Sequence, residues 1–285
     1  MKLHLTAKLL GGVAPPIFAL VAVVLLFTNR SSAVFGTPLL ATILYVAFVG
    51  AIYLLVSFIS ALSYVRSGNV SFLLLGSSLV IGGCSAILTF SLSSAPNYSV
   101  TVANLGFLIS AFLNFVSALN VYARVRNSTD GRTLNQNKKW IGIPIIVYST
   151  FAALSVLIAV LALSGATPPF FVQGVGGTVL RQEVVAACVA LFGISALIFL
   201  KMSRESHSDI LFWYSGGLAM LSLCFFVAFS LSVVGGELSW TGRIAQYLSG
   251  IYFLMLVLSS IRGSRKIPKE NSLQEKVTEI APERR

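Results

Sequence analysis

Residues 210–234 read ILFWYSGGLAMLSLCFFVAFSLSVV, a continuous apolar stretch without a charged side chain. A helix of about 20 residues is long enough to cross a hydrocarbon core of about 30 Å. Because a segment in lipid must satisfy its backbone hydrogen bonds internally, we expect such stretches to be helices. Seven others share this apolar character, at 9–27, 38–65, 70–93, 101–122, 141–164, 183–200 and 243–261. The sequence therefore predicts an all-α, polytopic membrane protein with eight transmembrane helices.

The composition leaves little room for anything outside these helices. The chain has 285 residues, of which 56% are hydrophobic and 10% charged, and its mean hydropathy is +0.88. The longest polar segments are 123–140 and 262–285. We therefore expect residues 1–261 to form one transmembrane domain and residues 262–285 a short cytoplasmic tail.

The net charge of +11 is distributed unevenly along the chain. Cytoplasmic segments of membrane proteins carry an excess of Lys and Arg. With the N-terminus inside, 17 of the 20 Lys and Arg residues are cytoplasmic, and only Arg30, Arg181 and Arg243 lie outside. This bias predicts a multi-pass plasma-membrane protein with both termini cytoplasmic. It indicates contact with membrane lipid and no nucleic-acid partner.

The predicted spans lack the residues that usually carry chemistry in a membrane. Intramembrane charges mark transport and proton pathways, yet no acidic residue or lysine lies deep in a span. Both histidines, His4 and His207, fall outside the spans. We therefore expect no retinal Schiff base, no metal or haem held by intramembrane histidine, and no other cofactor. Without an acid–base pair or nucleophile triad, the protein is expected not to be an enzyme.

The polar residues that remain gather at the predicted outer ends of the last helices. The connection 165–182 is long, and its apolar residues favour folding back onto the helix ends, with Gly174, Gly176 and Gly177 permitting a tight turn. It ends in Arg181-Gln182, and a second Arg–Gln group begins the eighth span, where spacings of three and four place polar residues on one helical face. We predict a site for a small or amphipathic ligand near the extracytoplasmic face, formed by Arg181, Gln182, Trp240, Arg243, Gln246 and Tyr247.

Asn97, Tyr98 and Asn104 are further candidates for this site. The alternative interpretation is structural, because Arg, Trp and Tyr at span ends are ordinary interface anchors. Deeper in the membrane, Asn114 is expected to form interhelical hydrogen bonds, and Gly216-Gly217 to mark close helix packing.

Three stretches carry a family resemblance: PNYSVTVANLGFLIS at 96–110, PPFFVQGVGGTVLRQ at 168–182, and FWYSGGLAML with WTGRIAQYLSGIYFL within 212–254. Together they resemble the N-terminal multi-helix membrane sensor region of archaeal and bacterial PAS-containing sensor histidine kinases, over roughly residues 70–261. The resemblance implies a membrane-associated sensor domain that passes a signal to the cytoplasm. Residues 262–285 leave no room for PAS or kinase domains, so we expect a separate, histidine kinase-like partner reached through the eighth helix and the tail.

The leading hypothesis is thus a non-enzymatic, sensor-like protein of signal transduction. Two alternatives stay open. One is a small-solute transporter or permease with a midplane cavity near Asn114, Cys84 or Cys224. The other is a structural subunit of a membrane complex.

Overall fold

The computed structural model describes residues 2–28, 38–127, 140–172, 174–230 and 236–264. Among these residues, eight helical spans are long and apolar enough to cross a membrane, which confirms the predicted all-α, polytopic class. The elements are α1 (Lys2–Thr28), α2 (Pro38–Tyr45), η1 (Val46–Ala51), α3 (Ile52–Ser67), α4 (Val70–Ser91), α5 (Pro96–Asn127), α6 (Gly142–Leu163), β1 (Phe171–Val172), β2 (Gly176–Gly177), α7 (Val179–Ser206), α8 (Asp209–Ser230) and α9 (Glu237–Ser264). Beyond Ser264, the predicted tail lies outside the described residues.

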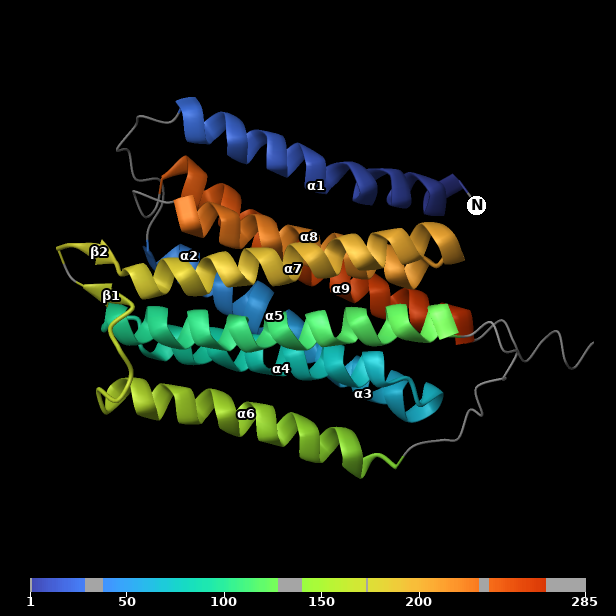
Figure 1. Cartoon of the computed structure of the whole chain (residues 1–285), viewed down its shortest axis with the longest axis horizontal. Helices are drawn as coiled ribbons and strands as arrows, with labels where there is room; N and C mark the ends of the chain where they lie inside the picture. The colour runs from blue at the N-terminus through green and yellow to red at the C-terminus, as the bar shows by residue number, and fades with distance from the viewer. Residues whose placement is uncertain (1, 29–37, 128–139, 173, 231–235, 265–285) are drawn as a thin grey trace, which may run out of the picture.

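The long helices lie side by side as a bundle (Figure 1). The start of α1 and the end of α9 lie at one end of the bundle, and the strands β1 and β2 lie at the other. The helices α1 and α6 form its outer edges. Only 6% of the apolar window of α1 is buried inside the protein, against 67% of that of α4, so α4 is central and α1 is largely exposed to the surroundings.

Several helices begin earlier than the sequence predicted, and for α7 and α9 this changes the setting of the candidate residues. Helix α7 begins at Val179 because Thr178 caps it, its hydroxyl accepting a hydrogen bond from the Arg181 backbone N–H at 3.3 Å. Helix α9 begins at Glu237, an acidic residue that suits the positive end of a helix dipole. Arg181, Gln182 and Trp240 are therefore helical residues, and the prediction of a loop at these positions was wrong.

The second span contains a feature that its apolar sequence does not indicate. Between α2 and α3, residues Val46–Ala51 form a π-helical segment, η1. The Gly250 Cα of α9 comes so close to it that an added Cβ would lie 3.1 Å from the Phe48 carbonyl oxygen. The ring of Phe48 stacks on Tyr247 with centroids 5.3 Å apart. Short π-helical segments are frequent at functional sites, and this one packs directly on α9.

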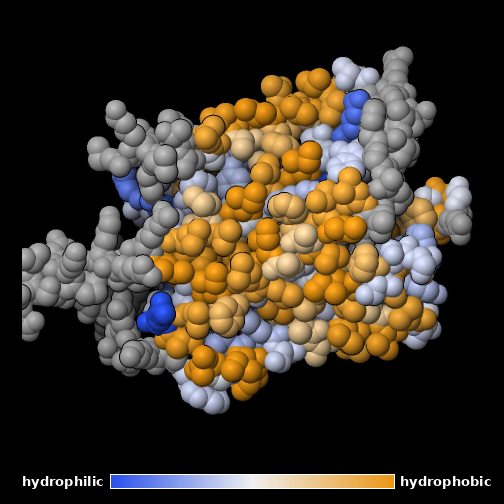
Figure 2. Space-filling view, turned by 180° about the vertical axis from the view of Figure 1, so that it is seen from behind, coloured by the Kyte–Doolittle hydropathy of each residue, from blue (hydrophilic) through white to orange (hydrophobic). Residues whose placement is uncertain are grey.

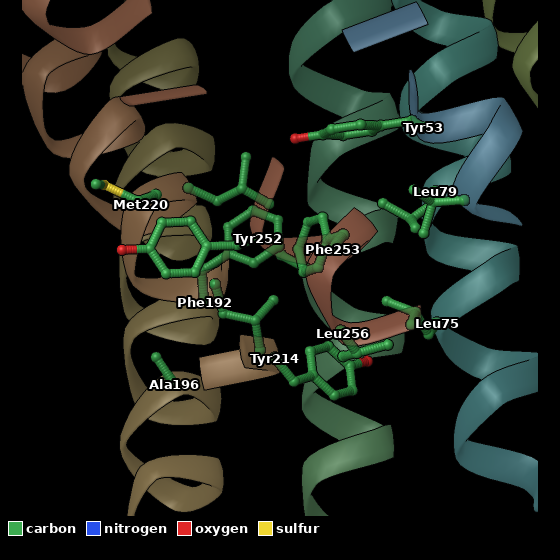
Figure 3. Packing of buried hydrophobic residues seen from close by; sticks show 14 of the residues in the cluster. Tyr53, Leu75, Leu79, Phe192, Ala196, Tyr214, Met220, Tyr252, Phe253 and Leu256 are labelled. Carbon is green, nitrogen blue, oxygen red and sulfur yellow. The ribbon is translucent and has the colours of Figure 1, made fainter. Parts of the chain in front are cut away.

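Aromatic rings fill the centre of the bundle between α3, α5, α7, α8 and α9 (Figure 3). Phe199 stacks on Tyr214 at 4.2 Å, and Tyr214 meets Phe253 edge to face at 6.1 Å. The glycines at 216 and 217 give room for these rings, since an added Cβ would collide with Tyr252 and Phe253, respectively. The predicted close packing at the glycine pair is confirmed.

Hydrogen bonds join the helices through hydroxyl groups. Tyr214 donates to the Asn114 amide oxygen at 2.8 Å, which confirms Asn114 as an interhelical partner. Ser215 and Ser222 of α8 donate to backbone carbonyls of α7 at 2.8 and 2.9 Å. Such bonds stabilise helix pairs in a membrane, where lipid is as apolar as the side chains.

The outer surface of the bundle is suited to lipid. In Figure 2, apolar side chains cover most of the face on view, and the more hydrophilic residues gather toward its two ends. Exposed residues such as Phe27, Leu197 and Phe58 contribute to the apolar surface of the bundle. A continuous apolar surface of this extent is not sustained in water, so the chain is a multi-pass membrane protein in contact with lipid.

The packing at Gly217 predicts a measurable loss of stability in Gly217→Ala. The new Cβ would lie 2.6 Å from the ring of Phe253, which is fully buried and has no room to move aside. We expect the free energy of unfolding in detergent micelles to fall by about 1–3 kcal/mol. Gly12→Ala is the matched control, because its nearest neighbour would be 3.6 Å away. An unfolding midpoint of Gly217→Ala equal to that of the control would contradict this packing.

Candidate functional site

A cavity of about 470 Å³ lies at the end of the bundle that carries β1 and β2. Its volume is within the range of small-molecule sites, about 300–1,000 Å³. Six helices contribute to it, and the lining residues are Tyr45, Thr89, Ser93, Pro96, Ser99, Val100, Ala103, Arg181, Cys224, Val227, Ala228, Ser239, Gly242, Arg243 and Gln246.

The lining residues follow helical spacing, so the cavity extends inward along the helices. On α5 they run from Pro96 at its first residue to Ala103, seven residues further on. At 1.5 Å per residue this is a depth of about 10 Å. The wall combines hydroxyl groups with small apolar side chains, and therefore suits a compact ligand that has both polar and apolar parts.

Arg181 enters the cavity from the first turn of α7. Its side chain is half-buried, and one terminal nitrogen donates to the Ala228 carbonyl at the long distance of 3.5 Å. Its Nε atom is buried and has no hydrogen-bond partner among the described residues. A buried donor without an acceptor costs free energy, so this guanidinium can donate a hydrogen bond to a ligand oxygen.

Arg243 and Gln246 enter the same cavity from α9, one turn apart. The Arg243 guanidinium carbon lies 5.7 Å from the centroid of the Trp240 ring, a cation–π contact that orients the side chain. Gln246 is almost fully buried, and the Tyr45 hydroxyl approaches its side chain from α2. The structure thus brings together Arg181, Arg243 and Gln246, which the sequence had placed in one site.

The other three predicted site residues do not line the cavity. Tyr247 stacks on Phe48, and its hydroxyl is also hydrogen-bonded to the Arg243 side chain. Trp240 contacts the lining residue Arg243 through its ring. Gln182 is half-buried beside Arg181, and its amide oxygen is buried without a hydrogen-bond partner among the described residues. Three of the six predicted residues, Arg181, Arg243 and Gln246, thus line the cavity, and ligand binding by the set stays a prediction.

The segment 165–182 folds back onto the bundle, as the sequence predicted. Strands β1 and β2 pair antiparallel, and Gly174 and Gly176 have φ of +85° and +106° at the turn. Phe170 is buried, and the Asn97 amide oxygen accepts hydrogen bonds from the backbone N–H of Phe170 and of Phe171, both at 3.0 Å. Asn97 therefore holds the hairpin and does not line the cavity.

Tyr98 and Asn104 are not lining residues either. Tyr98 packs in a satellite cluster around Val102 and Ile158. Asn104 is almost completely buried within the bundle.

Sequence reasoning missed the hydroxyl groups that complete the wall. Ser239 lies four residues before Arg243 and shares its helical face, a relation hidden by the assumption that the helix began at Arg243. Thr89 and Ser99 bond to each other's backbone carbonyls across α4 and α5, at 3.4 and 3.3 Å. The contact between Tyr45 and Gln246 of α9 could not be predicted from the sequence, because the π-helical segment that follows Tyr45 determines where this side chain points.

The electrostatic character of the cavity is positive. Two arginines line it, and none of its described lining residues is acidic. Glu183 and Glu237 lie at the same end of the bundle but are exposed. Within the described part of the chain, no three His, Cys, Asp or Glu residues are grouped closely enough to hold a metal ion.

No protein-family model matches this chain, and neither does a curated protein or a solved structure. The resemblance to sensor histidine kinases is therefore a prediction supported by the quoted motifs alone. What the structure establishes is the class: an eight-helix, polytopic membrane protein.

The contact at Asn97 predicts a specific change in hairpin dynamics. Asn97→Leu removes the acceptor for the Phe170 and Phe171 amides, and we expect hydrogen exchange at both amides to accelerate by about tenfold or more, which corresponds to roughly 1.4 kcal/mol of lost protection. Asn97→Asp keeps an acceptor oxygen and serves as the control, with exchange close to that of the wild type. Unchanged exchange in Asn97→Leu would show that the hairpin is held by other contacts.

Proposed function

We propose that the protein is a non-enzymatic, sensor-like component of the plasma membrane that binds a small or amphipathic ligand in the cavity lined by Arg181, Arg243 and Gln246. The single observation that carries this proposal is that residues from six helices, far apart in sequence, line one polar–apolar cavity. The motifs that resemble histidine-kinase sensor regions, at 168–182 and within 212–254, supply Arg181, Arg243 and Gln246.

The arrangement of the bundle supports a route for a signal. Helices α7, α8 and α9 contribute to the cavity at one end, and α9 continues to Ser264 at the opposite end. A ligand can shift these helices only if it binds one arrangement better than another. The proposed recipient is a cytoplasmic, histidine kinase-like partner that contacts the end of α9 and the tail.

Ligand-dependent stabilisation tests the proposed site. Across a panel of metabolites, a binding compound should raise the unfolding midpoint of the wild type in nanodiscs, because ligand that binds only the folded state adds to its stability. Arg181→Ala and Arg243→Ala should lose most of that rise, whereas Arg66→Ala, an exposed cation at the far end of the bundle, should keep it. Equal rises of the unfolding midpoint in the wild type and all three variants would contradict ligand binding at Arg181 and Arg243.

The orientation is a second prediction. The described cations Arg66, Lys201 and Arg204 lie at the end of the bundle opposite Arg181 and Arg243, and the positive-inside rule places the more basic end in the cytoplasm. A cysteine at Val175, an exposed residue of the hairpin, should react with an impermeant thiol reagent added outside cells. A cysteine at exposed Lys201 is the control and should stay protected. The reverse pattern would place the cavity on the cytoplasmic side.

A small-solute transporter is the second candidate. It is favoured by the π-helical segment Val46–Ala51 beside the cavity, since transporter sites use irregular helix segments. Of the residues expected for this alternative, Cys224 lines the cavity, whereas Asn114 is engaged with Tyr214. Uptake of a binding compound into proteoliposomes would favour transport over sensing.

A further inference from the structure

The cavity contains two cations in a setting that suits one class of ligand. We propose that it selects a compact organic anion, with a carboxylate or phosphate group held by Arg181 and Arg243 and an apolar body packed deeper between α5 and α8. This inference rests on the proposed ligand-binding function and specifies the chemistry of the ligand.

The first argument is charge balance. Arg181 and Arg243 both line the cavity, and its described wall contains no carboxylate. Guanidinium groups removed from water lose hydration, and their mutual repulsion is relieved only by negative charge. An anion bound between them would offset both costs, whereas a neutral or cationic ligand would offset neither.

The second argument is the hydrogen-bonding capacity of Arg181. Among the described residues its buried Nε–H has no acceptor, and a terminal nitrogen makes a long contact of 3.5 Å with the Ala228 carbonyl. Guanidinium groups bind carboxylates and phosphates through two parallel N–H···O bonds. A ligand oxygen at this position would satisfy the donor that the protein leaves unpaired.

The third argument is the way in which Arg243 is held. Its guanidinium lies over the Trp240 ring, a contact that fixes the charge without neutralising it. The protein therefore keeps a preorganised positive charge at the cavity, which lowers the ordering cost of binding an anion.

The remaining wall defines the body of the ligand. Beyond the arginines it offers the apolar side chains of Val100, Ala103, Val227 and Ala228 together with hydroxyl groups, among them those of Thr89, Ser99 and Ser239. With a volume of about 470 Å³ and a depth of about 10 Å, the site accommodates a head group and a short apolar portion. The same chemistry is offered by a soluble organic acid or phosphate and by the head group of an anionic lipid.

Matched probes separate charge from shape. Benzoate, phenyl phosphate, benzyl alcohol and benzylamine are compared by thermal unfolding of the full chain in nanodiscs of neutral phosphatidylcholine. A second arm replaces a fraction of this lipid with phosphatidylglycerol and adds no soluble probe. We expect the unfolding midpoint to rise by several degrees with an anionic probe or with phosphatidylglycerol, and not with the alcohol or the amine. A shift confined to the first arm identifies a soluble anion, and a shift confined to the second identifies a lipid head group.

Arg181→Gln and Arg243→Gln keep side-chain hydrogen bonding but remove the charge, and each should abolish the shift. Two variants are used so that a folding defect in one leaves the test intact. Lys201→Gln removes an exposed cation from the far end of α7 and should respond as the wild type does. Anion shifts that persist in both arginine variants, or equal shifts with benzyl alcohol, would overturn the anion assignment and leave the cavity as a ligand site. An unfolding midpoint that stays unchanged with every probe and lipid would overturn both the anion specificity and the proposed ligand-binding function.

Discussion

Helices in a membrane gain nothing from leaving lipid for one another, so their association depends on close contact and on hydrogen bonds. In this protein the contacts between α7, α8 and α9 meet both needs. Gly216 and Gly217 admit the rings of Tyr252 and Phe253, and Ser215 and Ser222 bond to carbonyls of α7. The cavity and the aromatic centre of the bundle are both built on these three helices.

The cavity differs from the rest of the bundle interior because it contains charged side chains. The interior is held by hydroxyl and amide groups, such as those of Tyr53 with Ser249 and Tyr214 with Asn114, which satisfy each other without net charge. Arg181 and Arg243 bring charge to a site partly removed from water, which is costly in an apolar setting. These neutral pairs join the helices in the interior, whereas the two arginines line the cavity to which six helices contribute.

The sequence predicted the spans because their apolar length is a one-dimensional property. It failed at helix ends, where the outcome depends on single residues such as the Thr178 cap and Glu237 in the first turn. Arg181, Arg243 and Gln246 could be grouped from topology, since both helix starts lie at one end of the bundle. Tyr45 and Ser99 could not, because which faces of α2, α4 and α5 turn inward is set by packing between distant segments. Tyr247 was assigned to the site on helical spacing, and its stacking on Phe48 could not be predicted because Phe48 belongs to a distant segment.

The π-helical segment Val46–Ala51 fixes a rotation as well as a contact. Tyr45 and Tyr53 are eight residues apart, and an uninterrupted α-helix would point them about 80° from each other. One residue accommodated in the wider turn reduces that offset to about 20°, so that Tyr45 meets Gln246 while Tyr53 bonds to Ser249 on the same neighbouring helix. At the present chain length, the direction of Tyr45 therefore depends on the wide π-helical turn being kept. A one-residue deletion that restored a regular α-helix would leave Tyr45 and Tyr53 seven residues apart and still about 20° from each other, whereas an α-helical turn of the present length would rotate Tyr45 away from α9.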